Sequence, residues 1–175
     1  MKLMSYIMQV NSFGEILIYE NILKHKIYVL FKKAMDIELL QQALENDANL
    51  NIINTNIQEI KRKKNEILQE LGLKRDDLKS FHKKLNGYMY VDNLKDLKYG
   101  RNIRWINLNK IEVIKITNGS ILCDIKIHDK GIALILKGYN HSFITLYLNE
   151  NIVFQKINDE EKILLKAVDY LSKQG

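Results

Sequence analysis

The 175-residue sequence contains no proline and a single cysteine, Cys123. One cysteine excludes an internal disulfide framework and is typical of a protein from a reducing compartment. No uninterrupted apolar run approaches the roughly 18 residues of a membrane span, and the first residues lack the pattern of a signal peptide. These absences predict a soluble intracellular protein without a membrane segment.

Residues that commonly bind metals or perform catalysis are few and scattered. No metal-ligand spacing relates Cys123 to any histidine or one histidine to another, whether His25, His82, His128 or His141. The sequence also lacks a glycine-rich phosphate loop, a dinucleotide-binding fingerprint, a nucleophile elbow and a zinc-protease helix. We therefore predict no catalytic residue, metal, cofactor or small-molecule ligand, and a protein that is not an enzyme.

Positive charge is in excess, but it comes almost entirely from lysine. Lysine and arginine together number 27 against 21 acidic residues, which gives a formal net charge of +6. A chain crowded with Lys, Ile and Asn and free of Pro is typical of an AT-rich genome, whose codons favour these residues. The net charge is therefore weaker support for nucleic-acid binding than its size suggests.

Short apolar runs separated by turn residues fill the stretch from Leu97 to Ile157. Asn118-Gly119 suits a type I′ turn, so it predicts a hairpin of residues 111–117 with residues 120–128, with Cys123 on the buried face. Turn residues at 129–131, 138–141 and 149–151 predict further strands at 132–137, 142–148 and 152–157. We expect an antiparallel meander of about five strands, or six if 101–108 joins it.

A terminal helix is predicted from Asp159 to Lys173. Asn158 followed by Glu161 has the spacing of a capping box, and Leu164, Val168 and Leu171 form one apolar stripe that would cover a face of the meander. The fold class is therefore α+β. We place an N-terminal region of short β segments and long basic helices at 1–87, and the meander with its helix at 88–175.

The first 33 residues carry a moderate β signal, in the runs 5–10, 15–19 and 27–31. These strands would form a small sheet of their own or extend the later meander, and the sequence does not choose between the two.

From Asp36 to Leu71 the apolar period becomes that of a helix. Apolar residues at a four-three spacing form a seam of Leu39, Ala43, Leu50, Ile53, Ile57, Ile60, Ile67 and Leu71. Asn46 and Lys64 occupy the two positions where this seam lacks an apolar residue. Sustained over about five heptads, this seam suggests a coiled coil and a homo-oligomer. Two helices folded back on each other after a break at residues 45–49, or packed on the sheet, would use the same stripe.

The stretch from Ile67 to Leu85 resembles a helix-turn-helix, with Gly72 at the turn. The resemblance implies that the second helix faces DNA through Lys74, Arg75, Lys79, Lys83 and Lys84, with phosphates met by Lys61, Arg62, Lys63 and Lys64. Leu68 in place of a small residue, and Asp76 and Asp77 in the second helix's first turn, depart from the motif. Two consecutive helices with a glycine stop remain the alternative.

Arginine and the only tryptophan come together in residues 97–106. On a strand, Arg101, Ile103 and Trp105 would share one face, with Arg104 and Ile106 on the other. Arg101, Arg104 and Trp105 would stack on bases or anchor an interface, unless the tryptophan belongs to the core and the arginines reach the strand edge.

The C-terminal half is similar to small uncharacterised proteins of large DNA viruses. The resemblance lies in Gly100–Ile106, Asn118-Gly119, Ile152–Lys156, Glu160-Glu161 and Asp169–Leu171. It implies a viral protein of the host cytoplasm, the nucleus or the virion interior, and names no activity. We expect a non-enzymatic nucleic-acid-associated protein that binds DNA or RNA phosphates through basic helices. The alternative is a structural or assembly protein that self-associates through the 39–71 seam.

Overall fold

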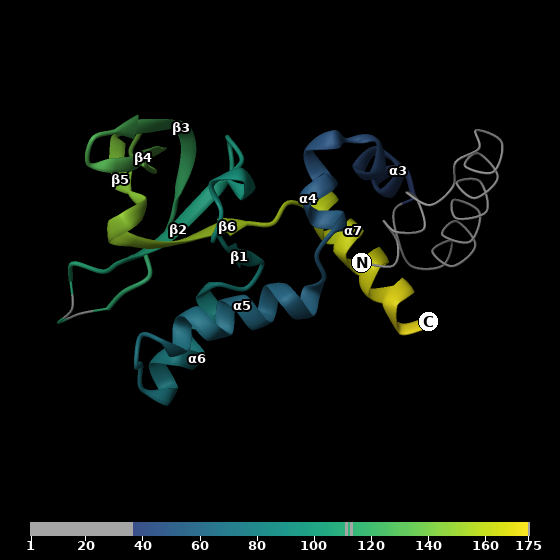
Figure 1. The fold of residues 1–175 in the computed structure, drawn as a ribbon, viewed down its shortest axis with the longest axis horizontal. Helices are drawn as coiled ribbons and strands as arrows, with labels where there is room; N and C mark the ends of the chain where they lie inside the picture. Colours follow the sequence, from purple (N-terminus) through teal and green to yellow (C-terminus); the bar gives the residue numbers. More distant parts are fainter. Residues whose placement is uncertain (1–36, 111, 113, 175) are drawn as a thin grey trace. The chain divides into compact units, whose positions relative to one another are not determined.

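The computed structural model describes residues 37–110, 112 and 114–174 (Figure 1). The chain folds as two compact units, one of Met1–Ile57 with Asn158–Gly175 and one of Gln58–Ile157. The strands predicted at 5–10, 15–19 and 27–31 lie outside the described residues. Each unit is taken by itself below.

The first unit is helical in its described part. It contains α3 (Ile37–Glu45), a 3-10 turn (Asp47–Asn49), α4 (Leu50–Ile53) and α7 (Asp159–Gln174), and both α3 and α4 pack against α7. The side-chain amides of Asn46 and Asn49 each donate to the Glu160 carboxylate at 2.9 Å. These bonds fasten the turn after α3 to the start of α7.

The predicted seam is therefore not one continuous helix. The chain leaves the helix after Glu45, where the Asn46 side chain accepts from the Ala48 N–H, and again after Ile53. Side-chain acceptors of this kind compete with helical hydrogen bonding, which explains the break. The predicted break at residues 45–49 is observed, and Ala43 of the seam is buried within the first unit.

The capping box of α7 is confirmed. The Asn158 N–H donates to Glu161 at 2.8 Å, and the Glu161 N–H donates back to Asn158 at 2.7 Å. Leu164 lies in the core, as predicted. Within its own unit this helix packs against α3 and α4, and the cover that we expected it to give the meander stays a prediction.

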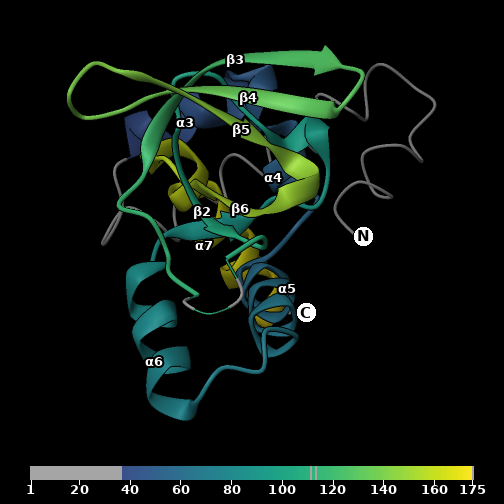
Figure 2. The same cartoon turned by 90° about the vertical axis from the view of Figure 1, so that its left-hand side faces the viewer.

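The second unit is built on a six-stranded antiparallel sheet, which confirms the α+β class (Figures 1 and 2). Its strand order is β1-β6-β2-β3-β4-β5, so β2 to β5 form a meander and β6 returns beside β2. The strands are β1 (Tyr88–Tyr90), β2 (Asn102–Asn107), β3 (Ser120–His128), β4 (Gly131–Lys137), β5 (Phe143–Tyr147) and β6 (Asn151–Lys156). A 3-10 turn (Leu94–Asp96) lies between β1 and β2, and another (Leu148–Glu150) carries the chain from β5 into β6.

The hairpin predicted at Asn118-Gly119 is wrong. Ile116 bridges to Ile106 of β2, and Ser120 pairs with Ile103, so the chain on both sides of Gly119 runs along β2. Three residues, 117–119, oppose two of β2, which makes a bulge. Gly119 has φ +100°, and a Cβ atom there would collide with the Asn102 side chain. The glycine thus serves a close strand approach and not a chain reversal.

Cys123 is exposed, contrary to the buried position that we expected. The register of β3 against β4 shifts between Leu122 and Asp124, so Cys123 is an extra residue in the strand. Such a bulge changes which side chains face the core, so the expected alternation of buried and exposed residues along β3 is interrupted at Cys123.

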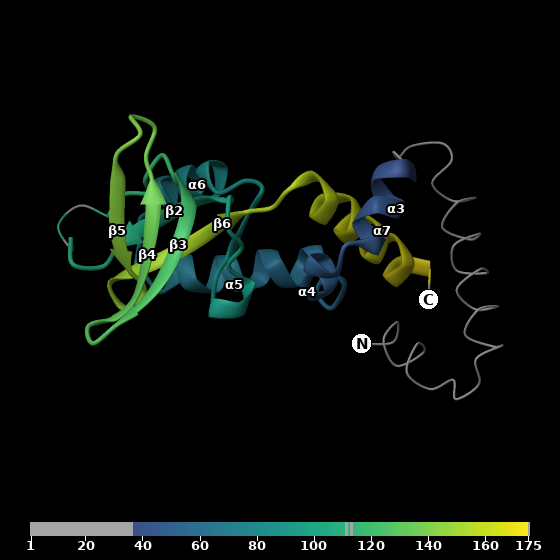
Figure 3. The same cartoon turned by 90° about the horizontal axis from the view of Figure 1, so that it is seen from above.

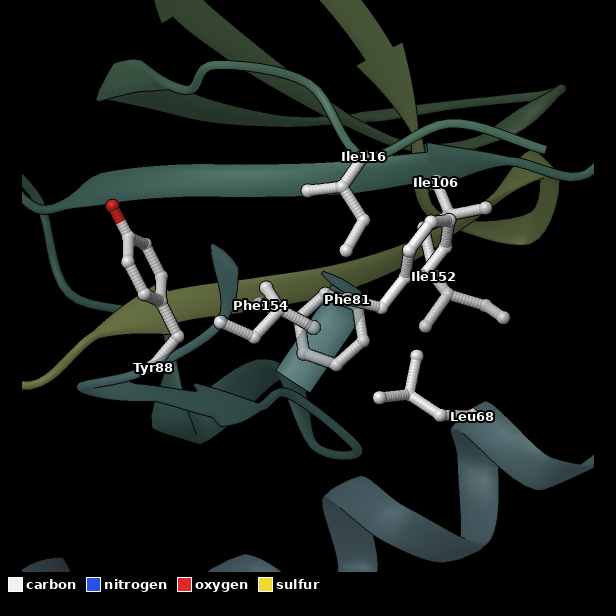
Figure 4. Close-up of a cluster of buried hydrophobic side chains, with 8 residues drawn as sticks. Leu68, Phe81, Tyr88, Ile106, Ile116, Ile152 and Phe154 are labelled. Carbon is white, nitrogen blue, oxygen red and sulfur yellow. The ribbon is translucent and has the colours of Figure 1, made fainter. Parts of the chain in front are cut away.

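Two apolar clusters lie on opposite faces of β2 and β6. Ile103 and Val153 face a cluster shared with β3, β4 and β5, in which Leu122, Leu134 and Leu136 are fully buried. Ile106, Ile152 and Phe154 face the other side and meet helices α5 (Ile57–Gln69) and α6 (Arg75–Lys84) through Leu68, Phe81 and Leu85. Figure 4 shows Leu68 reaching toward Phe81 and Ile152. This second cluster fixes how α5 and α6 lie on the sheet.

Candidate nucleic-acid interface

The connection between α5 and α6 is short and ends in a glycine, as the sequence predicts. Gly72 has φ +60°, which terminates α5 in the left-handed region, and Leu71 and Leu73 on either side pack against the cluster under the helices. Lys74 then holds the N-cap position of α6 in an extended conformation without a side-chain cap bond. Both helices therefore have one apolar side anchored to the sheet.

Helix α6 has a buried side and a cationic side. Phe81 is buried and Leu78 is half-buried against the sheet. Three exposed cations, Arg75, Lys79 and Lys83, follow one another at intervals of four residues, which places them in one row along the helix. Lys74 and Lys84 are also exposed.

This row is not required for the stability of the helix. Like charges four residues apart destabilise a helix by about 0.2–0.5 kcal/mol per pair. Asp76 and Asp77 in the first turn favour the helix through its dipole, and Asp76 lies 3.9 Å from the Lys79 ammonium. That distance is at the outer limit of an ion pair between exposed side chains, which contributes little. The cations of α6 thus remain open to an external anion.

The basic run in α5 has a different environment. Arg62 is bonded to Glu59 at 2.6 Å and to Glu66 at 2.7 Å, one turn away on either side, and these carboxylates raise its pKa. Lys63 bonds to Asp92 at 2.7 Å, which raises the pKa of the lysine and lowers that of Asp92. Of the run, Lys61 is exposed and has no ion-pair partner among the described residues.

Lys64 points into the protein. Its side chain is only 8% exposed, and its ammonium donates to the carbonyl oxygens of Leu85 at 2.9 Å and Tyr88 at 3.0 Å. Burial lowers the pKa of Lys64, and the nearby Lys61 charge lowers it further. An ammonium at the carbonyl end of α6 is favourably placed toward the helix dipole. Lys64 therefore joins α5 to the end of α6 and is not presented to solvent.

His82 lies beside this buried ammonium. Burial lowers the pKa of His82 below its usual value near 6.5, and the Lys64 charge lowers it further. The histidine is half-buried on α6, so its neutral form is favoured at neutral pH. It adds no positive charge to the cationic row.

Arg104 is tied to the protein's own backbone. Its guanidinium donates to the Lys84 carbonyl and, at 3.3 Å, to the Asn118 carbonyl, and it lies 4.8 Å above the centre of the Tyr88 ring. The Tyr88 hydroxyl in turn donates to Asn102 at 2.9 Å. Arg104 thus connects the end of α6, strand β1 and the bulge at Gly119.

The predicted faces of the arginine-rich strand are confirmed for Ile103, Trp105 and Ile106. Ile103 and Trp105 lie toward one apolar cluster, and Ile106 lies toward the other. Trp105 is half-buried against its cluster, so much of its ring is covered, and Arg101 is likewise half-buried. Arg104 lies on the face of Ile106, and Arg101 comes directly before β2.

The charge of the chain is divided unevenly between the two units. Residues 58–157 hold nineteen Lys and Arg against eleven Asp and Glu, a net charge of +8, whereas the remaining residues hold eight against ten, a net charge of −2. Sequence reasoning did not single out the exposed lysines of the sheet, Lys110, Lys115, Lys126, Lys130, Lys137 and Lys156. Counting charge within the boundaries of the units would have found them.

Other kinds of site find no support in the described part of the chain. Residues 37–110, 112 and 114–174 contain no group of three His, Cys, Asp or Glu side chains arranged to hold a metal ion. Among the same residues, no helix combines the length and the apolar character that crossing a membrane requires. The sequence matches no family model, and no curated protein or solved structure is significantly similar to it.

Proposed function

We propose that this chain is a non-enzymatic nucleic-acid-associated protein that binds phosphates through helix α6. The observation that carries the proposal is the exposed row of Arg75, Lys79 and Lys83, on a helix whose other side is fixed to the sheet. The net charge of +8 on residues 58–157 would draw a polyanion to this unit before any specific contact forms.

The arrangement favours phosphate contact over reading of bases. The helix-turn-helix resemblance directs the first turn of α6 toward a groove, but Asp76 and Asp77 in that turn would meet the phosphate backbone unfavourably. Lys79 and Lys83 lie further along the helix, Lys79 at 3.9 Å from the Asp76 carboxylate and Lys83 one turn beyond it. Binding that depends little on sequence and strongly on salt is the expected result.

The other predicted nucleic-acid residues have supporting roles in this proposal. Lys61, Lys74 and Lys84 add exposed charge around α6. Arg62 and Lys63 are already matched by carboxylates, while Lys64 and Arg104 hold the helices in place. Trp105 belongs to strand β2 and packs against an apolar cluster, and Arg101 comes directly before that strand. The viral resemblance stays a prediction and is not needed for this function.

A role in assembly through the 39–71 seam has less support. Its apolar residues are shared between two units, with Ala43 buried in the helical unit and Ile67 and Leu71 packed against the cluster under α5. A coiled coil needs one uninterrupted stripe on one helix.

The test compares duplex DNA binding of three proteins at about 50 and 200 mM salt, where phosphate contacts differ greatly in strength. These are the natural chain, the triple variant Arg75→Gln, Lys79→Gln, Lys83→Gln, and a control, Lys110→Gln, Lys115→Gln, Lys130→Gln. Both variants lose three charges from exposed positions of the same unit. Glutamine keeps helix propensity close to that of lysine, so α6 should stay folded, which circular dichroism would check.

We expect the natural chain and the control to bind at low salt and the α6 variant to lose most of its affinity. Equal losses in the two variants would show that net charge, and not α6, attracts DNA. A natural chain that binds neither DNA nor RNA at about 50 mM salt would refute the function itself.

A further inference from the structure

Among the described strands, β5 ends the sheet and has a neighbour on one side only. Figure 3 shows it on the outer side of β4, and the sheet order ends with it. Its five residues, Phe143–Tyr147, include no charged residue and no proline. Phe143 is 66% exposed and Ile144 is 37% exposed. Natural proteins usually protect such an edge with lysine, proline or a covering segment.

The hydrogen bonding of the β4–β5 hairpin shows which backbone groups face outward. The Gly138 N–H donates to the Ser142 carbonyl at 2.8 Å, so these two residues form a hydrogen-bonded pair. Bonded pairs recur every second residue in an antiparallel ladder, which assigns the inward bonds to Ile144 and Leu146. The N–H and C=O groups of Phe143, Thr145 and Tyr147 therefore point away from β4.

These outward groups are open within the described part of the chain. Asn151 donates its side-chain amide to the Tyr147 carbonyl at 2.7 Å. The outward N–H and C=O groups of Phe143 and Thr145 have no hydrogen-bond partner among the described residues. The edge thus offers a short, uncharged and regular row of donors and acceptors.

We propose that β5 pairs with β5 of a second copy of this chain, antiparallel and with Thr145 at the two-fold axis. In that register Thr145 exchanges both backbone bonds with its own counterpart, and the Tyr147 N–H of each copy donates to the Phe143 carbonyl of the other, while the Tyr147 carbonyl keeps its bond to Asn151. The same patch serves both copies, which is the condition for a closed symmetric dimer. Pairing the two β5 strands gives hydrogen-bond partners to outward backbone groups of both copies.

Side chains and charges fit this register. Phe143 would lie opposite Tyr147 of the second copy on one face, an aromatic pair, and Ile144 opposite Leu146 on the other face. On the neighbouring strand β4, Lys137 pairs with Phe143. Continued across the axis, the row from Lys137 through Phe143 reaches Tyr147 and then Ala133 of the second copy, so the two copies of Lys137 do not oppose each other.

The uncharged edge of β5 suits a contact between two copies better than a contact with nucleic acid. No residue of β5 is charged, so the strand offers nothing to a polyanion, and the dimer is independent of nucleic acid. Five paired residues cover less area than the roughly 1,200–2,000 Å² of a standard stable interface. The association should therefore be reversible and concentration-dependent.

The experiment measures the mass of the full chain by sedimentation velocity over a range of concentrations, without nucleic acid. The natural chain should pass from monomer to dimer as concentration rises. Thr145→Lys places two like charges at the axis, and Phe143→Lys removes the aromatic pair, so both should stay monomeric. Tyr139→Lys is the control, because it changes an aromatic residue in the turn before β5 that is even more exposed than Phe143.

Amide hydrogen exchange of the natural chain gives a second measurement that needs no variant. The Thr145 N–H should become protected as the dimer forms, whereas the Ile144 N–H, bonded to β4, should be protected at every concentration. A natural chain that stays monomeric would overturn the proposal, as would Thr145 protection that does not change with concentration. A dimer that survives Thr145→Lys would locate the interface elsewhere, for instance in the 39–71 seam.

Discussion

Two basic stretches of the same unit have opposite environments. In α5, Arg62 and Lys63 are matched by carboxylates and Lys64 is buried, so the run from 61 to 64 offers solvent little free charge. In α6, Arg75, Lys79 and Lys83 are all exposed, and of the three only Lys79 lies near a carboxylate of the described residues, at 3.9 Å. Charge density along the sequence favours the first stretch, whereas the structure favours the second.

The difference lies in what surrounds each helix face. The carboxylates of Glu59 and Glu66 sit three residues before and four residues after Arg62, a spacing that is visible in the sequence. Asp92 and the carbonyl groups that bind Lys64 come from distant parts of the chain. A basic run is therefore a candidate phosphate-binding surface only where carboxylates and carbonyl groups of the protein do not already bind its cations.

The largest effect is expected from removing the buried ammonium with Lys64→Met. Gly87 accepts from the Ile157 N–H at 2.9 Å, so the neighbouring Tyr88 carbonyl faces away from β6 and depends on Lys64. The orphaned carbonyl should lower the free energy of unfolding by about 1–3 kcal/mol, as measured by urea denaturation. The matched control, Lys61→Met in the exposed part of the run, should change it by less than about 0.5 kcal/mol. Equal effects would mean that Lys64 is no more structural than Lys61.

A smaller loss is expected from Arg104→Lys. Lysine keeps the charge but cannot reach two carbonyl groups while it covers the Tyr88 ring, so the unfolding free energy should fall by about 1 kcal/mol. DNA affinity should not change, because this guanidinium is already bonded to the protein. A fall in affinity without a fall in stability would return Arg104 to the nucleic-acid surface.

The smallest effect concerns pH. The pKa of His82 is lower in the folded chain than its usual value near 6.5. At pH values between the folded pKa and 6.5, the unfolded chain therefore binds more protons than the folded chain. Stability should therefore fall as the pH drops from 6.5 through the folded pKa, and His82→Gln should remove this part of the slope. Urea denaturation at several pH values checks the slope, and an NMR titration giving His82 a pKa of 6.5 or higher would contradict it.

Features with a short-range cause were predictable from the sequence. The capping box at Asn158 and Glu161, the stop at Gly72 and the helix from Arg75 onward each depend on residues within one turn. Alternation also predicted the two faces of β2, because one bulge-free strand keeps its period.

Features that depend on distant partners were not predictable. Asn118-Gly119 permits a chain reversal, but pairing with β2 was available to the same residues and prevailed. Cys123 is exposed because of one extra residue in β3, and β6 joins β2 because its alternate residues complete both apolar clusters. For the candidate site, the sequence indicated the cations of α6 correctly as exposed, but not which cations of α5 were already occupied.

The most direct test of the central claim is the salt dependence of duplex DNA binding in two triple variants. One is Arg75→Gln, Lys79→Gln, Lys83→Gln in α6, and the other is Lys61→Gln, Arg62→Gln, Lys63→Gln in α5. Each phosphate contact contributes about 0.9 to the slope of log affinity against log salt. If α6 makes the phosphate contacts, the α6 variant should lose about 2.7 from this slope and the α5 variant no more than about 0.9. Equal losses, or a larger loss in the α5 variant, would contradict phosphate binding by α6.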